Sequence, residues 1–168
     1  MERNPRLLDI ACGTGWAVSY ASRVAKGHGE FYGVDISSKM IDKAEANFAR
    51  YGNLHFFRAN ADSLPFDDGF FDYIICTNAF HHFSNPDQVV REAYRVLKPC
   101  GRIYILDTTA DSSIIKMLDR LSKKIERSHV KIYSTQEYQS LFQRAGLNYS
   151  NGESIVFFIK IHVGEKSE

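Results

Sequence analysis

Five polar side chains with the chemistry of a binding site recur through the first two thirds of the chain. They are Asp9, Asp35, Asp62, Asn78 and Asp107, and each stands at or just after the end of an apolar run. A carboxylate offers two acceptor oxygens to hydroxyl, amine or ammonium donors. If the apolar runs are parallel strands, these groups converge at one edge of a sheet and could bind a ligand rich in such donors.

A glycine pair, Gly13 and Gly15, stands between the apolar run 6–10 and the helically spaced run 16–25. Glycine lets the backbone approach a ligand closely, and the free N–H groups of a following helix point to the same place. The pattern predicts a strand, a tight turn and a helix that together bind a nucleotide-like ligand. A glycine pair alone is as often only a turn, so this interpretation depends on the polar residues that follow.

Strands and helices alternate through the stretch that must position these residues. Hydrophobic periodicity and turn residues predict strands at 6–10, 30–35, 53–58, 70–77 and 102–107. Between these strands we expect three helices. The first, at 16–25, has one apolar face formed by Ala17, Tyr20, Ala21 and Val24, and the second has an apolar stripe formed by Met40, Ile41, Ala44 and Phe48. The third starts at Asn85-Pro86 and ends at 98–101. Such alternation favours a parallel sheet with helices on both faces and a ligand at the carboxyl ends of the strands.

The pattern changes after residue 107. Residues 112–127 have helical spacing, and Ser134 with Glu137 matches a capping box before a helix that ends at Gly146. Two short strands, 147–149 and 154–163, are expected to form a hairpin through Asn151-Gly152. The predicted fold is therefore α/β, a doubly wound Rossmann-like and mostly parallel sheet with an antiparallel C-terminal edge strand and helices on both faces.

Composition restricts the partners and the compartment. The 168 residues carry a net charge of +1, which does not indicate binding to nucleic acid, and no run is long enough to span a membrane. The basic stretch 116–131 is best interpreted as a solvated helix face, because acids interrupt it and no aromatic residues are interleaved with it. The three cysteines, Cys12, Cys76 and Cys100, lack the spacing of metal ligands and indicate reduced thiols. The N-terminus has no apolar signal core, so we expect a cytoplasmic protein.

Five ordered motifs resemble the class I S-adenosylmethionine-dependent methyltransferases, particularly the small-molecule and quinone-type branch. They are the stretches 7–15, 33–37, 61–66, 71–83 and 92–102. Ala11 and Cys100 stand where many relatives have glycine. Relatives also often carry a helical N-terminal segment over the cofactor, and here five residues precede the first strand. The resemblance implies one methyltransferase domain over 1–168, with a cofactor-binding half at 1–107 and a variable helical cover and hairpin at 108–168.

The resemblance also implies roles for individual residues. Asp35 would accept the ribose hydroxyls, Asp62 would accept from the adenine amine, and Asp9 would lie near the amino end of the methionine. The other residues implied at the cofactor are Ala11, Gly13, Gly15, Ile36, Met40, Ala61 and Asn78. Each carboxylate has a structural alternative: Asp35 as a surface acid, Asp62 in an Asx-turn, and Asp9 as a support for the turn.

Methyl transfer from this cofactor needs no catalytic triad, because in-line displacement can be driven mainly by proximity. His81 and His82 are candidate bases for a protic acceptor, from their position after the fourth strand and their pKa near neutrality. A structural role for both is at least as well supported. The pair lacks the carboxylate and spacing of a metal site, and we expect no metal. The expected acceptor is a small molecule, and the expected assembly is a monomer or a homodimer.

Two other functions compete with methyl transfer. A non-catalytic S-adenosylmethionine-binding or regulatory subunit fits the same motifs. A nicotinamide-dependent oxidoreductase is disfavoured, because Val18 occupies the third glycine position of G-x-G-x-x-G.

Overall fold

A mostly parallel sheet runs through the residues that the structure, a computed structural model, describes: 4–112, 115, 117, 131–156 and 158–168. The strands are β1 (Arg6–Ile10), β2 (Glu30–Asp35), β3 (Leu54–Arg58), β4 (Phe71–Thr77), β5 (Leu97–Thr108), β6 (Leu147–Val156) and β7 (Ile159–Lys166). The helices are α1 (Trp16–Val24), α2 (Ser38–Phe48), the 3₁₀ turn η1 (Phe80–His82), α3 (Pro86–Val96) and α5 (Thr135–Arg144).

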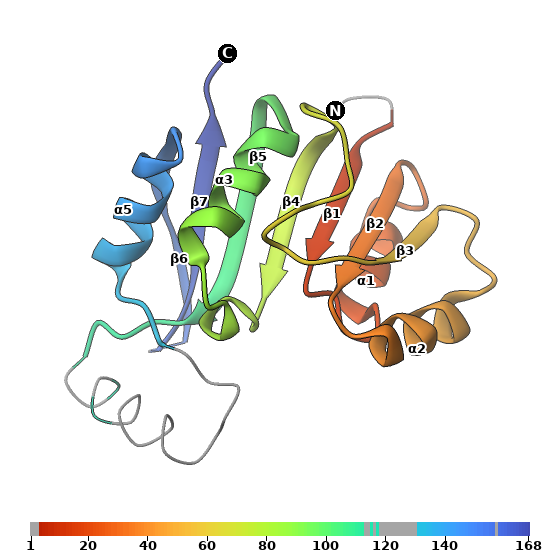
Figure 1. The fold of residues 1–168 in the computed structure, drawn as a ribbon, viewed down its shortest axis with the longest axis horizontal. Helices are drawn as coiled ribbons and strands as arrows, with labels where there is room; N and C mark the ends of the chain where they lie inside the picture. Colours follow the sequence, from red (N-terminus) through yellow and green to blue (C-terminus); the bar gives the residue numbers. More distant parts are fainter. Residues whose placement is uncertain (1–3, 113–114, 116, 118–130, 157) are drawn as a thin grey trace.

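The strand order is β3-β2-β1-β4-β5-β7-β6 (Figure 1). Strands β1 to β5 pair in parallel, whereas β7 pairs antiparallel with β5 and with β6. The order reverses at β1, which has β2 on one side and β4 on the other. The predicted fold class is confirmed, and this reversal is where open α/β sheets bind ligands.

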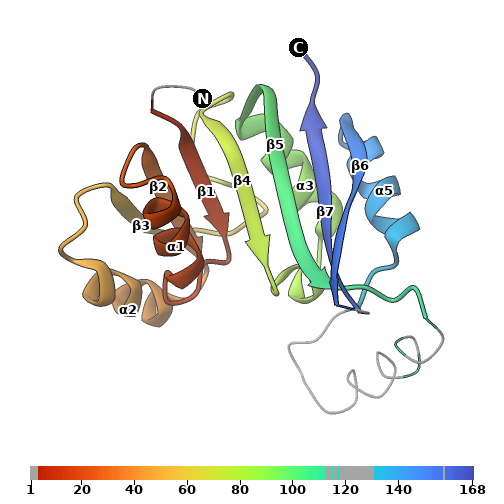
Figure 2. The same ribbon diagram turned by 180° about the vertical axis from the view of Figure 1, so that it is seen from behind.

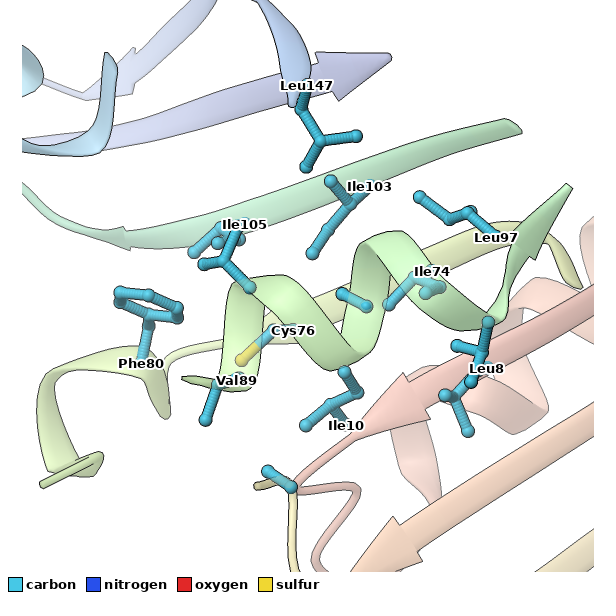
Figure 3. Packing of buried hydrophobic residues seen from close by; sticks show 14 of the residues in the cluster. Leu8, Ile10, Ile74, Cys76, Phe80, Val89, Leu97, Ile103, Ile105 and Leu147 are labelled. Atoms are coloured by element: carbon cyan, nitrogen blue, oxygen red, sulfur yellow. The ribbon is translucent and has the colours of Figure 1, made fainter. Parts of the chain in front are cut away.

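Helices cover both faces of the sheet. On one face α3 packs over the central strands and α5 packs over β6 and β7, and Val89, Ile74 and Phe142 belong to the same buried cluster. On the other face α1 and α2 lie near β2 and β3, where Val18 and Phe48 pack with Phe31 and Leu54. The two views agree on this division (Figures 1 and 2). The close view shows side chains of the first cluster from the strands, among them Ile10, Cys76 and Ile105, together with Val89 of α3 (Figure 3). Burial of this apolar surface is the main source of stability.

The buried face of α1 differs from the predicted one. Tyr20 and Val24 are 67% and 65% exposed, whereas Val18, Ser19 and Ser22 are buried. The hydroxyl of Ser19 donates to the Trp16 carbonyl and that of Ser22 accepts from the Asn53 side chain, so both polar groups are paired at the buried face. Hydrophobicity alone therefore misplaces Tyr20 and Val24, whereas Ala21 packs against the buried cluster as predicted. On α2, Ile41, Ala44 and Phe48 are buried as expected, whereas Met40, predicted on the same stripe, is exposed.

The boundary between α3 and β5 also differs from the predicted one. The helix begins as predicted, with the side chain of Asn85 accepting a hydrogen bond from the Gln88 N–H and Pro86 in the first turn. It ends at Val96, and β5 begins at Leu97, earlier than the predicted 102. Cys100 adopts a positive φ of 60°, the conformation that glycine would provide at this turn.

The C-terminal hairpin turns later in the chain than Asn151-Gly152. Both residues lie within β6, at an irregularity in its pairing with β7 between Asn151 and Ser154. The predicted position of the turn was therefore wrong, whereas the predicted antiparallel pair of C-terminal strands is present. Glycine inside a strand is typical of a bulge, which competes with a turn for the same sequence signal. The capping box of Ser134 and Glu137 at α5 is confirmed. The helix predicted over 112–127 and the basic stretch 116–131 fall almost entirely outside the described residues.

None of the helices among the described residues has both the length and the apolar character needed to cross a membrane.

Candidate functional site

A cavity of about 280 Å³ opens at the carboxyl ends of β1, β2, β3 and β4. This volume is close to the lower end of the range for small-molecule sites, roughly 300–1,000 Å³. Its lining residues are Ala11, Val34, Asp35, Ile36, Ala59, Asn60, Ala61, Asp62, Ala79, His82, Phe83 and Ser84. The lining is mainly apolar, with two carboxylates, and therefore suits a planar apolar group that carries hydroxyl and amine donors.

The turn after β1 has a left-handed backbone at three positions. The φ angles are 60° at Ala11, 53° at Gly13 and 83° at Gly15. A Cβ added at Gly15 would lie 2.8 Å from the ring of Phe56, whereas one at Gly13 would meet no atom within 4 Å. Gly15 is therefore required by packing within the protein, and Gly13 presents a bare backbone toward open space.

Asp35, at the end of β2, ties this turn to the next strand. Its Oδ2 accepts a 2.9 Å hydrogen bond from the Gly13 N–H, and its Oδ1 accepts one of 2.9 Å from the Ser37 N–H. Each carboxylate oxygen can accept a further hydrogen bond, because each has two lone pairs. The carboxylate is thus oriented at the cavity by the backbone and keeps acceptor capacity for a ligand.

Asp62 lies in the loop after β3, which forms an Asx-turn: the Asp62 N–H donates to Oδ1 of Asn60 over 3.2 Å. Helix α3 holds this loop in place. Glu92 accepts from the Leu64 N–H at 2.9 Å, and Arg95 donates to the Leu64 carbonyl at 3.0 Å. The Asx-turn uses the Asn60 side chain and the Asp62 backbone, so it leaves the Asp62 carboxylate at the cavity lining.

Asp9 lies beneath the turn and is 1% exposed. Neither of its carboxyl oxygens has a hydrogen-bond partner among the described residues. Burial raises the pKa of Asp9 to about 8; the Val18 backbone amide opposes the shift and the negative charge of Asp35 adds to it. A buried carboxyl group without a partner is costly, and a cationic ligand group nearby would restore its charged form.

The side chains of the two histidines after β4 have different surroundings. His82 lines the cavity, whereas the ring of His81 turns toward the end of β5, where its Nδ1 lies 2.8 Å from Oδ1 of Asp107. Asn78 has a positive φ of 51°, and its N–H donates to the Leu106 carbonyl at 2.7 Å.

Half of the predicted cofactor residues line the cavity: Ala11, Asp35, Ile36, Ala61 and Asp62. Gly13 and Gly15 shape the adjoining turn, and Asp9 lies below it. Met40 on α2 and Asn78 are not part of the lining. Sequence reasoning missed Val34, Ala59, Asn60 and Ser84; the Asn60-x-Asp62 spacing, typical of an Asx-turn, could have indicated Asn60.

A larger hollow of about 890 Å³ lies on the face that carries α1. Its lining includes Leu7, Tyr20, Val24 and Tyr73 but no carboxylate. It offers no acceptor of the kind found at the carboxyl ends of the strands, so the smaller cavity is the candidate site.

S-adenosylmethionine matches the groups present at the smaller cavity. Its ribose hydroxyls and adenine amine are donors that suit Asp35 and Asp62, and its ammonium group suits the unpartnered Asp9. A dinucleotide fits less well, because Val18 fills the third glycine position and is fully buried in α1.

Relatives with similar sequences are named as methyltransferases. A family described as methyltransferase domain matches residues 8–105. The uncharacterized methyltransferase YcgJ of Bacillus subtilis is 36% identical over 151 residues, which cover 87% of this chain and 58% of that protein. The C-methyltransferase UbiE of ubiquinone and menaquinone biosynthesis in Pectobacterium atrosepticum is 34% identical over 124 residues, 72% of this chain and 49% of that protein.

The structural comparison agrees with the sequence comparison. The crystal structure of the Bacillus YcgJ protein superposes with a TM-score of 0.85 at 25% identity, covering 99% of this chain and 93% of that one. The chain spans about half to three fifths of the length of the two curated relatives.

Proposed function

Since this chain belongs to the class I S-adenosylmethionine-dependent methyltransferases, we propose that it transfers the methyl group of S-adenosylmethionine to a small-molecule acceptor. The acceptor binds at the carboxyl ends of β4 and β5, next to the cofactor cavity. The names of the relatives make a quinone-type aromatic acceptor a reasonable first substrate to test.

Three carboxylates hold the cofactor in this proposal. Asp35 accepts from the ribose hydroxyls, Asp62 accepts from the adenine amine, and Asp9 faces the ammonium group through the turn at Gly13 and Gly15. Ala11, Ile36 and Ala61 supply apolar contacts to the adenosine. Met40 and Asn78 act at the margin of the site, since neither lines the cavity.

Catalysis rests mainly on positioning. Bound S-adenosylmethionine supplies a methyl group already activated by the positive sulfur. The chain's own residues hold the acceptor in line with that methyl group and exclude water. Such positioning supplies on the order of 7–11 kcal/mol in well-oriented intramolecular reactions.

One observation carries the proposal: Asp35 and Asp62 meet at one cavity beside a turn whose Gly13 backbone has open space before it. The two acids come from the ends of two different strands, and both supply hydrogen-bond acceptors to the same cavity. A purely structural role for Asp35 or for Asp62 would not require them to share a cavity.

Calorimetric titration with S-adenosylmethionine, and with NAD as the control ligand, tests the cofactor. We expect binding of the first only. Formation of S-adenosylhomocysteine in the presence of an acceptor then tests the reaction. Binding of NAD alone would contradict the proposal.

A non-catalytic cofactor-binding subunit is the competing function. This alternative predicts the same binding of S-adenosylmethionine in the titration, but no methyl transfer to any acceptor. Turnover therefore separates the two functions.

A further inference from the structure

Helix α1 presents its large apolar side chains outward, whereas its serines are buried against the sheet. Trp16, Tyr20 and Val24 are each about two-thirds exposed. They follow one another at four-residue spacing, which places them on one face of the helix. A surface helix normally buries its apolar face and exposes its polar one. A contiguous exposed apolar face of this kind marks a site of interaction.

A wide apolar hollow adjoins this face of α1. Its volume is about 890 Å³, and its lining includes Tyr20 and Val24 of α1, Leu7 of β1 and Tyr73 of β4. Figure 2 shows α1 on the near side of the sheet, with no described helix in front of β4 and β5. The ring of Tyr73 is therefore exposed. The helix face and the hollow form one apolar surface, here called the α1 surface, which comprises Leu7, Trp16, Tyr20, Val24 and Tyr73.

The charges beside the α1 surface have one sign. Residues 10–29 contain no aspartate or glutamate, whereas Arg23 and Lys26 are exposed at the end of α1 and just after it. Among the residues that the structure describes, neither of these two side chains has a hydrogen-bond or ion-pair partner. Lys26 also lines the hollow. The apolar surface thus has a cationic border, which is complementary to an apolar layer that carries negative charge.

The aromatic residues of the α1 surface suit the boundary between water and hydrocarbon. Trp and Tyr combine an apolar ring with a polar N–H or O–H, and both are enriched at membrane interfaces. The Trp16 ring packs edge-on against Phe48 of α2, with the ring centroids 5.4 Å apart, so the indole is held at the surface. Arg and Lys have apolar stems that can follow the apolar layer while the charged ends stay in water. A basic helix with exposed aromatic residues is typical of binding to a membrane surface.

We propose that the α1 surface binds reversibly to the surface of a bilayer that contains anionic phospholipids. Trp16, Tyr20 and Val24 enter the boundary between the headgroups and the acyl chains, and α1 lies in the plane of that boundary. Acyl chains occupy the hollow beside α1. The guanidinium of Arg23 and the ammonium of Lys26 pair with lipid phosphates. This binding does not depend on methyl transfer.

Trp16 is the only tryptophan of the chain, so tryptophan fluorescence reports the α1 surface alone. The first experiment mixes the full chain with vesicles of phosphatidylcholine, with and without phosphatidylglycerol. We expect the emission to move to shorter wavelength with the anionic vesicles, and bromine carried on the lipid acyl chains should quench it. Quenching requires contact between the indole and the acyl region, which adsorption by charge alone does not provide. An unchanged emission, or a shift without quenching, would overturn the proposal.

The second experiment measures the affinity of variants for the same vesicles by co-sedimentation. The double variant Tyr20→Gln, Val24→Gln should bind at least about tenfold more weakly, because binding increases with the apolar area buried. Arg23→Gln and Lys26→Gln should each bind about fivefold more weakly, which is the contribution of one cation near an anionic surface. All four side chains are exposed, so we expect the variants to fold, and urea unfolding checks this.

The matched controls are Ile155→Gln and Arg91→Gln. Ile155 is 55% exposed on β6, at the edge of the sheet opposite to β3, and Arg91 is exposed on α3, on the other face of the sheet. Both variants should bind vesicles as the wild type does. Equal losses in the controls and in the α1 variants, or no loss in the α1 variants, would overturn the assignment of lipid binding to this surface.

A protein partner is the competing occupant of the α1 surface. A second copy of the chain would shift the Trp16 emission as the protein concentration rises without lipid, and vesicles would add no further change. A helix of another protein would leave the emission unchanged on vesicles. Either result overturns membrane binding. Titration with S-adenosylmethionine separates this proposal from the proposed function: vesicle binding without cofactor binding defeats only the proposed function, and the reverse result defeats only membrane binding.

Discussion

The backbone N–H of Gly13 donates a 2.9 Å hydrogen bond to Oδ2 of Asp35, which joins the turn after β1 to the end of β2. The turn is thus connected to the carboxylate that faces the cavity. Removal of this side chain should alter both the shape of the turn and the acceptors offered to a ligand.

Asp35→Ala should weaken S-adenosylmethionine binding at least tenfold, roughly 1.4 kcal/mol. The substitution removes the acceptors for the ribose and leaves two backbone N–H groups without their partner. Calorimetric titration measures the affinity. Asp42→Ala is the control, because Asp42 is an exposed acid of the neighbouring α2. Equal affinity in the two variants would remove Asp35 from the binding site.

Asp9 should make the free energy of unfolding depend on pH. Burial raises its pKa from 3.8 to about 8, so between these values the folded chain holds a proton that the unfolded chain releases. Stability therefore decreases as pH rises through this window, by up to about 1.4 kcal/mol per pH unit from this one group. Asp9→Asn should flatten the dependence in urea unfolding between pH 5 and 7.5. An unchanged slope, matching that of Asp42→Asn, would show that Asp9 titrates normally.

Cofactor binding should release a proton from Asp9. A cation placed beside a protonated carboxyl group lowers its pKa, so near pH 7 binding of the ammonium group should expel about one proton. Binding heats measured in phosphate and in Tris then differ by the ionisation heat of the buffer. Asp9→Asn should bind without this difference. Equal heats for the wild-type protein in both buffers would place the ammonium group elsewhere.

Substitutions of the two glycines of the turn should have different effects on stability and on cofactor binding. Gly15→Ala places a Cβ 2.8 Å from the Phe56 ring at a φ of +83°, and should destabilise the fold by about 2 kcal/mol or more. Gly13→Ala, with φ +53° and no atom within 4 Å, should cost only about 1 kcal/mol of stability but should weaken cofactor binding. Urea unfolding and calorimetry separate the two effects. A larger loss of stability in Gly13→Ala would contradict this assignment.

Cys100→Gly should stabilise the protein. Cys100 has a φ of 60°, which strains a residue with a side chain, and glycine removes the strain at some entropic cost. We expect a free energy of unfolding about 0.5–1 kcal/mol above that of Cys100→Ala, which removes the thiol but keeps the strain. If the alanine variant is the more stable one, backbone strain at this turn is negligible.

The sequence predicts the order of elements well, because strands buried on both faces give strong apolar runs such as 70–77. It also predicts which strand ends carry Asp35 and Asp62. Single-residue orientation is harder to predict: Tyr20 looks like a core residue on α1, yet Ser19 and Ser22 face the sheet. The pairing of His81 with Asp107 joins residues 26 positions apart, and no local pattern indicates it. Asn151-Gly152 shows that one dipeptide can form a hairpin turn or an irregular strand, and tertiary pairing decides between them.

The position of β7 has a consequence for biosynthesis. This strand is translated after β6, yet it lies between β5 and β6. On the ribosome, the hydrogen-bonding edge of β5 therefore stays unpaired until β7 has emerged, and β6 has no partner in the sheet before then. A nascent chain arrested before residue 159 should engage chaperones that bind exposed strands, and one released after residue 166 should not.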